Sequence, residues 1–313
     1  MKPFIIFAFI LLVGGFGAFK SATDSIEMIP ETAAELGKKL FFDPILSADH
    51  SISCASCHKP EYGFADNIPF SFGIDSILTN RNTPSVKNVL SRSLFFWDGR
   101  ASTLEEQALM PIENPNEMNL SIGEAVRRLN DDKAYANAFQ VIYHQPADPN
   151  TLAKAIAAYQ RTLESTYTAF DRYMEGDETA ISESAKRGKE IFLGKANCFE
   201  CHFGPDFTQD ELLNIGIYDS LKYADLGYGG ITNNRSDMGK FKVPSLRNVA
   251  HTAPYMHNGM FADLRAVIDY YNDPEKVIAQ PQNVTDRLLK PLNLTEQEKQ
   301  DLEAFLISLS DQD

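Results

Sequence analysis

Hydrophobic residues recur at helical spacing in several separated segments of this chain, whereas the long alternating runs typical of β-strands are lacking. The longest periodic segment predicts a single helix over about residues 150–174, and Pro149 suits its first turn. Its apolar face consists of Leu152, Ile156, Tyr159 and Leu163. The pattern therefore predicts a mostly α-helical fold.

Capping residues mark the start of two further helices. Thr32 precedes Glu35, and Thr295 precedes Glu298, at the spacing of a capping box. The predicted buried positions of the second helix are Leu302, Phe305, Leu306 and Leu309. Residues 71–84 and 209–244 are instead rich in Gly, Asn, Asp and Ser, which predicts long irregular loops of the kind that serve a site.

Two features indicate how the chain is divided. Residues 175–178 form a polar break, from which we predict one domain over residues 23–178 and a second over residues 179–313. Near the start, Lys2 is followed by an uncharged apolar run of sixteen residues, from position 4 to position 19. This run predicts a signal peptide over residues 1–22, with an uncleaved N-terminal anchor as the alternative, and it is short for a membrane span.

All four cysteines lie in two copies of the motif C-x-x-C-H. The copies are Cys54-Ala-Ser-Cys57-His58 and Cys198-Phe-Glu-Cys201-His202. This motif attaches c-type haem: the thiols add to the porphyrin vinyl groups, and the adjacent histidine becomes the proximal iron ligand. Disulfides, a zinc site or a thioredoxin-like pair are the alternatives, but a zinc site of four thiolates would leave both histidines unexplained. We therefore expect two covalently bound haem c groups, with His58 and His202 as iron ligands.

A short stretch with a glycine and then an aromatic residue precedes each motif, at residues 34–41 and 186–192. Both stretches predict amphipathic helices that lead into the haem-binding turn. This arrangement resembles the N-terminal helix of class I cytochromes c. The expected fold is therefore mostly α, with two class I cytochrome c-like haem domains and long irregular loops. Because c-type haem is attached outside the cytoplasmic membrane, the expected location is the periplasm.

Six further blocks carry a more specific resemblance. They are residues 40–44 (LFFDP), 81–85 (RNTPS), 96–100 (FWDGR), 117–118 (EM), 244–249 (PSLRNV) and 253–259 (APYMHNG). Together with the haem motifs they resemble the bacterial dihaem cytochrome c peroxidase family, which includes the methylamine-utilisation protein MauG. The resemblance implies that the N-terminal haem is the peroxide site and that the C-terminal haem relays electrons.

The resemblance also implies roles for side chains around the first haem. His58 matches the proximal ligand of the peroxide-binding haem, and Glu117 and Gln107 match the acidic and amide residues on its opposite side. Peroxide cleavage needs such a pair, because one oxygen loses a proton and the leaving oxygen gains one. Trp97 matches the residue between the two haems, although lone tryptophans are more often core residues. Without the resemblance, Glu117 would be interpreted as a surface carboxylate.

A calcium ion is implied between the two domains. The family's site uses an asparagine side chain and backbone carbonyls of a Thr-x-Pro segment, and Asn82, Thr252 and Pro254 match these positions. Oxygen donors with several waters suit Ca²⁺.

Two positions depart from the peroxidase pattern. Many members close the first haem with a histidine in a Ser-x-Gly-His segment, where this chain has Ile74. We therefore expect a first haem that is five-coordinate or water-bound at rest, with His50 as the alternative ligand. Where peroxidases place an axial methionine on the second haem, this chain has Tyr271, the ligand type of MauG-like members. The alternatives for that ligand are Tyr270, Met256 and Met260, and the alternative role for Tyr271 is that of a buried structural tyrosine.

The expected activity is reduction of hydrogen peroxide to water, with electrons from a small redox protein such as cytochrome c or a cupredoxin. The net charge of −14 suits a basic soluble donor and argues against nucleic acid as a partner. The resemblance further implies a homodimer. The competing interpretations are a MauG-like enzyme that oxidises side chains of a partner protein, and a dihaem electron carrier without catalytic activity.

Overall fold

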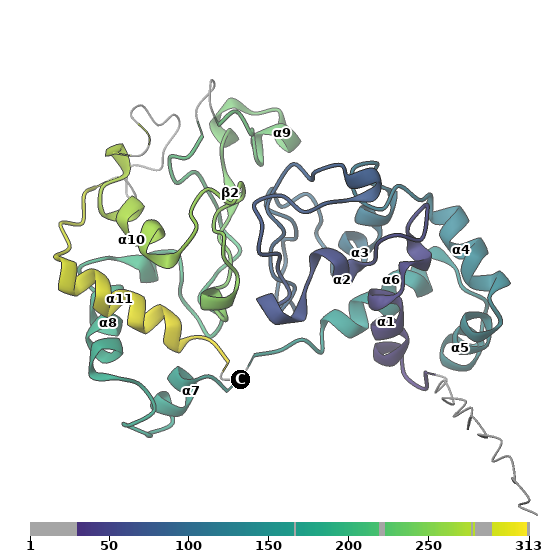
Figure 1. The fold of residues 1–313 in the computed structure, drawn as a ribbon, viewed down its shortest axis with the longest axis horizontal. Coiled ribbons are helices and arrows are strands. Elements are labelled where there is room, and N and C mark those ends of the chain that lie inside the picture. The colour runs from purple at the N-terminus through teal and green to yellow at the C-terminus, as the bar shows by residue number, and fades with distance from the viewer. Residues whose placement is uncertain (1–29, 166, 219–222, 277, 279–289, 312–313) are drawn as a thin grey trace, which may run out of the picture.

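The computed structural model describes residues 30–165, 167–218, 223–276, 278 and 290–311, which form two lobes (Figure 1). The N-terminal lobe contains α1 (Ala33–Phe42), α2 (Cys54–Cys57), α3 (Leu104–Glu113), α4 (Ile122–Asp131), α5 (Lys133–Tyr143) and α6 (Pro149–Gln160). The C-terminal lobe contains α7 (Ala169–Met174), α8 (Glu183–Leu193), α9 (Gly229–Thr232), α10 (Leu264–Asn272), α11 (Glu296–Ser308) and the antiparallel strands β1 (Leu212–Leu213) and β2 (Phe241–Lys242). The prediction of a mostly helical fold with little sheet is confirmed. The predicted leader at residues 1–22 lies outside the described residues.

One close pair of helices forms the frame of each lobe. α1 packs against α6 in the first lobe, and α8 packs against α11 in the second. A glycine makes each approach possible: a methyl group on Gly37 would lie 1.9 Å from the carbonyl oxygen of Ala155, and one on Gly188 would lie 1.9 Å from that of Asp301. Both helix pairs therefore depend on the same steric device.

The predicted helix starts and core positions are largely confirmed. Thr32 with Glu35, and Thr295 with Glu298, form complete capping boxes at α1 and α11. The four predicted core residues of α11 and its end are buried, and they are Leu302, Phe305, Leu306 and Leu309. The hydrophobic side chains of each helix pair thus fill the core of their own lobe.

The prediction of one continuous helix over residues 150–174 is wrong. α6 ends at Gln160, and the Thr162 hydroxyl donates to the Tyr159 carbonyl at 2.7 Å, so a side chain satisfies a backbone acceptor at this helix end. The following residues run between the lobes, where the Leu163 carbonyl accepts from the Asn88 backbone N–H at 2.8 Å. α7 then packs on the second lobe through Phe170, which contacts Phe207 and Phe305. The chain therefore passes between the lobes before α7, and the domain boundary at residue 178 stays a prediction.

The duplication is more extensive than the two haem motifs indicate. Residues 81–104 and 241–264 align without a gap, since each residue of the first segment corresponds to the one 160 positions later, as Pro84 does to Pro244. Equivalent local features recur in both segments: left-handed backbone at Asn88 and Asn248, and a bridge between Phe95 and Ala101 that matches the bridge between Tyr255 and Phe261. The two segments therefore share one backbone course.

These two segments also join the lobes by a reciprocal pair of backbone hydrogen bonds. The Asn82 N–H donates to the His257 carbonyl at 2.7 Å, and the Lys242 N–H donates to the Trp97 carbonyl at 2.7 Å. Asn82 and Lys242 are equivalent positions, and so are Trp97 and His257. Each lobe therefore gives the other the same contact that it receives.

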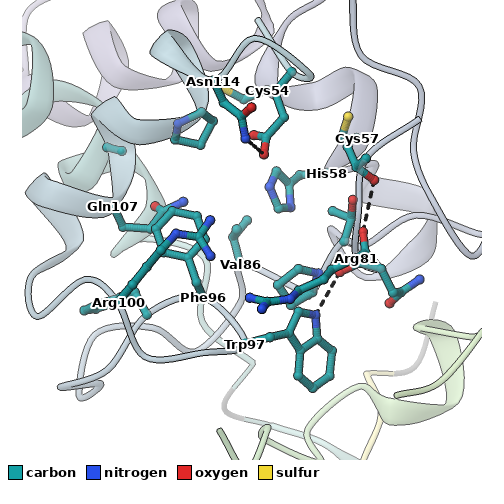
Figure 2. Close-up of a pocket in the computed structure, with 18 of the residues that line it drawn as sticks. Cys54, Cys57, His58, Arg81, Val86, Phe96, Trp97, Arg100, Gln107 and Asn114 are labelled. Carbon is teal, nitrogen blue, oxygen red and sulfur yellow. Dashed lines mark hydrogen bonds between the residues drawn. The ribbon is translucent and has the colours of Figure 1, made fainter. Parts of the chain in front are cut away.

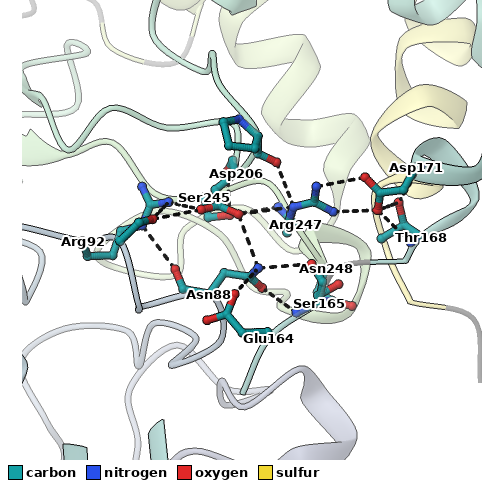
Figure 3. A network of polar contacts seen from close by, with 12 residues as sticks. Asn88, Arg92, Glu164, Ser165, Thr168, Asp171, Asp206, Ser245, Arg247 and Asn248 are labelled. Atoms are coloured by element: carbon teal, nitrogen blue, oxygen red, sulfur yellow. Dashed lines mark hydrogen bonds and ion pairs between the residues drawn. The ribbon is translucent and has the colours of Figure 1, made fainter. Parts of the chain in front are cut away.

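A buried polar network forms a second part of the seam (Figure 3). The Asp206 carboxylate accepts from Arg92 and, at 3.3 Å, from the Asn88 amide of the N-terminal lobe. Arg247 lies 3.3 Å from the same carboxylate and also binds Asp171 at 2.8 and 2.9 Å. Charged groups of both lobes thus neutralise one another inside the seam, which couples the position of each lobe to the other.

Candidate active site and haem-binding sites

A cavity of about 800 Å³ lies beside the first C-x-x-C-H motif. Cys54, Cys57 and His58 line one side of this cavity, and Gln107 and Glu117 also line it. Figure 2 shows the His58 ring pointing into the space that Gln107, Arg100 and Phe96 border. The structure therefore brings the predicted first-haem residues together around one cavity.

The His58 imidazole is oriented by the backbone. Its Nδ1 donates to the Phe64 carbonyl at 3.1 Å, and burial lowers the pKa of the ring, so the neutral tautomer keeps a lone pair on Nε2. An iron-binding histidine needs this arrangement, in which one nitrogen is held by the protein and the other is free to ligate. His58 fits a proximal haem ligand.

The two thiols of the motif also fit covalent attachment of haem. They are free of disulfide bonds, and burial raises the pKa of Cys54 to about 12 and that of Cys57 to about 11. A thioredoxin-like pair would instead need a lowered thiol pKa. A haem c group requires two thiols, an oriented imidazole and a large adjoining cavity. The first motif offers all three.

The side chains assigned to peroxide chemistry carry the electrostatic features of a proton-transfer site. Burial raises the pKa of Glu117, while the charge of Arg100 and a hydrogen bond from the Asn114 amide, at 2.7 Å to Oε1, act to lower it. The Gln107 Oε1 atom is buried and has no hydrogen-bond partner within the described part of the chain. A buried amide oxygen without a partner is costly, and a molecule bound next to Gln107 would supply the missing hydrogen bond.

Ile74 adjoins this site through its backbone, although it is not among the residues that line the cavity. Its backbone N–H donates to the Glu117 carbonyl at 2.8 Å, and its side chain is 4% exposed. Gly73 permits the contact, because a methyl group there would lie 2.1 Å from the Asn116 carbonyl oxygen. The segment is thus fixed against the Glu117 backbone. His50 is exposed, and His58 is the one histidine of the cavity lining among the described residues.

Trp97 lies in the cavity wall at the junction of the two lobes. Its Nε1 donates to the Asn82 carbonyl at 2.8 Å, and its own carbonyl accepts from the Lys242 N–H of the other lobe. The indole is therefore held by Asn82 of its own lobe, while the Trp97 backbone is held by the other lobe, and the side chain is partly buried rather than packed in a core.

The second motif repeats the orientation of the histidine. Nδ1 of His202 donates to the Phe207 carbonyl at 2.9 Å, and burial lowers the pKa of the imidazole. Cys198 and Cys201 are free, and burial raises the pKa of Cys198 to about 12. Asp206, which takes part in the buried network of the seam, directly precedes Phe207. That network therefore supports the turn that orients His202.

Tyr271 and Tyr270 have different environments in the second lobe. Burial strongly raises the pKa of Tyr271, and Tyr270, Cys198 and Cys201 contribute to the shift through their charges. The Tyr270 hydroxyl instead donates its proton in a hydrogen bond to the Ile215 carbonyl. Met256, Met260 and Tyr271 pack against the hydrophobic cluster that contains Tyr270. Of the two tyrosines, Tyr271 is therefore the one whose hydroxyl is available to act as an iron ligand.

The three residues matched to calcium binding lie along the interface between the lobes. The Asn82 amide donates to the Ile68 and Pro69 carbonyls at 3.1 and 3.4 Å, and Gly259 brings Pro69 close to Pro254. The Thr252 hydroxyl donates to the Val249 carbonyl at 3.3 Å. Within the described ranges, no cluster of three or more His, Cys, Asp or Glu side chains could hold a metal ion. The predicted calcium ligands are an amide side chain and backbone carbonyls, which are not among these four side-chain types. The calcium site therefore stays a prediction.

Sequence reasoning missed several residues of the first cavity. Arg100 lies inside a block that had been recognised for Trp97, and it stacks over the Phe96 ring at 3.5 Å. Asn114 could have been found from its position three residues before Glu117. Lys242 gave no such signal, because it reaches the cavity from the other lobe.

The described part of the chain contains no helix of the length and apolar character needed to cross a membrane.

Comparison with known proteins places these sites in a family. The family described as di-haem cytochrome c peroxidase matches residues 31–179, and the cytochrome c family matches residues 185–310. The methylamine utilization protein MauG of Methylorubrum extorquens is 41% identical over 290 residues, which cover 90% of this chain and 79% of that protein. The cytochrome-c peroxidase IdrP1 of a Pseudomonas species is 36% identical and covers 90% of this chain and 82% of its own.

A solved structure gives the same result. The crystal structure of a MauG-like protein associated with microbial copper homeostasis has a TM-score of 0.81 and 33% identity, with 91% of each chain covered. The two haem motifs, their oriented histidines and the shared length and fold lead to one conclusion. This chain belongs to the family of dihaem cytochrome c peroxidases and MauG proteins.

Proposed function

We propose that this protein is a dihaem c-type peroxidase, which reduces hydrogen peroxide to water with electrons from a small redox protein. The observation that carries the proposal is the cavity beside His58, where the residue of a carboxylate with a raised pKa and that of an unpartnered amide oxygen line the same space. A plain electron carrier needs neither group.

A haem held by Cys54, Cys57 and His58 would supply the iron and the redox chemistry for peroxide reduction. The protein residues act on protons and orientation. Glu117 takes the proton of the bound oxygen and returns it to the leaving oxygen, because its raised pKa brings it closer to neutral pH, where it can both accept and donate. The free Gln107 oxygen accepts a hydrogen bond from peroxide and holds it in line.

Electrons cross from the second lobe to the first past Trp97. Support for this path is its position at the seam, where hydrogen bonds fix the indole to Asn82 and its carbonyl to Lys242. Tyr271 is the proposed sixth ligand of the second haem, supported by its burial near both cysteines of that motif. A phenolate stabilises ferric iron, which suits a centre that stores oxidising equivalents.

The first haem is proposed to be open at rest. Ile74 cannot ligate iron, its segment is fixed by the hydrogen bond to the Glu117 carbonyl, and no second histidine of the described residues lines the cavity. A spectrum of the fully oxidised protein tests this point. We expect a high-spin signature from one haem, and two low-spin haems would contradict it.

Ile74 and Tyr271 also favour a second activity, in which the same oxidising equivalents act on a side chain of a partner protein. Steady-state turnover separates the two functions. We expect rapid oxidation of reduced cytochrome c or reduced cupredoxin by peroxide. If the oxidised protein reacts with stoichiometric peroxide but turns over no small donor, the result would favour oxidation of a partner protein. Failure to bind peroxide or cyanide in any oxidation state would leave an electron carrier.

The location and the remaining partners rest on the family and on general chemistry. We place the protein in the periplasm, because haem c is attached outside the cytoplasmic membrane. A calcium ion held by Asn82, Thr252 and Pro254 would join the lobes through oxygen donors, and removal with a chelator should then change the spectrum of the holoprotein. A homodimer is expected from the family, and sedimentation measures it.

A further inference from the structure

The first haem cavity is not built by the N-terminal lobe alone. The C-terminal lobe supplies five residues of its lining, namely Ala224, Asp225, Leu226, Lys242 and Pro244. Lys242 belongs to β2, and its backbone N–H is committed to the Trp97 carbonyl. The strand is therefore held against the N-terminal lobe at the residue whose side chain lines the cavity.

The cationic side chains of the cavity lining differ in their partners. Arg81 pairs with Asp98 and Asp225 at 2.5 and 2.7 Å, and Arg100 pairs with Asp98 at 3.0 Å. Arg92 pairs with Asp206 and lies 3.7 Å from Asp210. Each of the three guanidinium groups thus has a carboxylate of the protein within ion-pair distance.

Lys242 lacks such a partner within the described part of the chain. No ion pair or hydrogen bond joins its ammonium group to a described residue, although Asp210 is close enough to act on it through space. Burial lowers the pKa of Lys242 to about 8, which is the expected response of a cation withdrawn from water without a full counter-charge. Lys242 is partly exposed and is one of the residues that line the cavity.

We propose that the Lys242 ammonium binds a propionate carboxylate of the N-terminal haem, so that the C-terminal lobe holds the haem of the other lobe. A haem carries two propionates, and a buried carboxylate requires a paired cation or hydrogen-bond donors. The three arginines are already paired, and Lys242 is the cation of the lining that the protein leaves available. The inference depends on haem attachment at Cys54 and Cys57, and it does not depend on the peroxidase reaction.

The arrangement has a consequence for the redox centre. A positive charge beside the haem favours the reduced iron and raises its midpoint potential, because reduction adds a negative charge. Lys242 also fixes the Trp97 carbonyl through its backbone N–H. One residue of the second lobe therefore sets the charge at the first haem and holds the aromatic residue between the lobes.

The test is a spectroelectrochemical titration of the holoprotein with Lys242→Met, which removes the ammonium and keeps most of the apolar stem. We expect a lower midpoint potential for the cyanide-binding haem, an unchanged potential for the other haem, and a shifted propionate-bending band in the resonance Raman spectrum. Lys240→Met is the matched control, since Lys240 lies two residues away and pairs with Asp237 at 2.8 Å.

Unchanged potential and Raman band in Lys242→Met would overturn the proposal, and so would an equal shift in Lys240→Met. If Lys242→Met does not load two haems, Lys242→Arg carries the test. Because Lys242→Arg keeps the positive charge, we expect the midpoint potential of the first haem to stay unchanged. The guanidinium is a different hydrogen-bond donor, so the propionate-bending band should shift. An unshifted band would overturn the proposal. Peroxide turnover by the parent protein is measured separately, so failure of the peroxidase function and failure of this inference are distinguishable.

Discussion

In the N-terminal lobe, α3 carries Gln107 beside the haem cavity, whereas in the C-terminal lobe the equivalent helix α10 carries Val267 at that position, 160 residues later. Four residues further along, the relation is reversed: α3 has Pro111, and α10 has Tyr271. Proline offers no side-chain ligand, and valine offers no hydrogen bond. Equivalent helices therefore carry different groups. α3 has the Gln107 amide, which could bind an incoming molecule, and α10 has Tyr271, a candidate iron ligand.

The comparison separates the parts that hold haem from the parts that decide its chemistry. Both lobes keep a glycine at the helix crossing and a carbonyl that orients the histidine of the C-x-x-C-H motif. The lobes differ at two equivalent pairs of positions, Gln107 with Val267 and Pro111 with Tyr271. Under the proposed function, the shared frame would hold each haem, and a few side chains on α3, α10 and the loop after α3 would set its reactivity.

The largest effect is expected from Glu117→Gln, which removes the proton shuttle and keeps the size of the side chain. We expect kcat/KM for peroxide to fall by about 10²–10⁴-fold, while both haems are retained. Glu113→Gln is the control, because Glu113 is an exposed carboxylate at the end of α3, four residues before Glu117. Equal activity of the two variants would remove Glu117 from the mechanism and weaken the distinction between the lobes.

Tyr271→Phe tests the other side of the comparison. Loss of an anionic phenolate destabilises ferric iron, so the midpoint potential of the low-spin haem should rise by about 0.1 V or more, within the ~0.8 V that axial ligands span. Tyr270→Phe removes a hydrogen bond to the Ile215 carbonyl and should leave the haem spectrum unchanged. A spectrum that responds to Tyr270→Phe and not to Tyr271→Phe would reverse the assignment.

The shared frame is tested by Gly37→Ala and Gly188→Ala. Each added methyl group would meet a backbone carbonyl at 1.9 Å, so the helices must separate, at a cost of about 1–3 kcal/mol or more in the free energy of unfolding. Gly123→Ala in α4 has no neighbour within 4 Å and should stabilise the helix by about 0.5–1 kcal/mol. Urea unfolding measures all three, and a cost in only one lobe would show that the frames are not equivalent.

The smallest effect concerns the pH profile of the first site. The Asn114 amide donates to Glu117 and favours its charged form, so Asn114→Ala should raise the pKa of Glu117 further. Because the carboxylate is the active base, the acid limb of kcat/KM should move to higher pH, by less than about one unit. Movement of that limb to lower pH would contradict the assigned role of the hydrogen bond.

Local signals in the sequence identified much of this molecule. Both capping boxes, the haem motifs and the core face of α11 depend on residues within a few positions of one another, and they could be predicted. The break after Gln160 could not, because it depends on contacts such as that of Leu163 with Asn88, far apart in the chain. Lys242 at the first haem cavity is a similar case, since the docking of two lobes brings it there.

The reciprocal backbone bonds, Asn82 to His257 and Lys242 to Trp97, have the pattern of an isologous contact, in which position i meets j and j meets i. Two identical subunits associate by this rule, so the lobes meet as subunits of a symmetric pair would. Their covalent connection mainly raises the effective concentration of one lobe near the other. Fusion in one polypeptide also allows the partners to accumulate different mutations, which separate copies of a single gene product could not do.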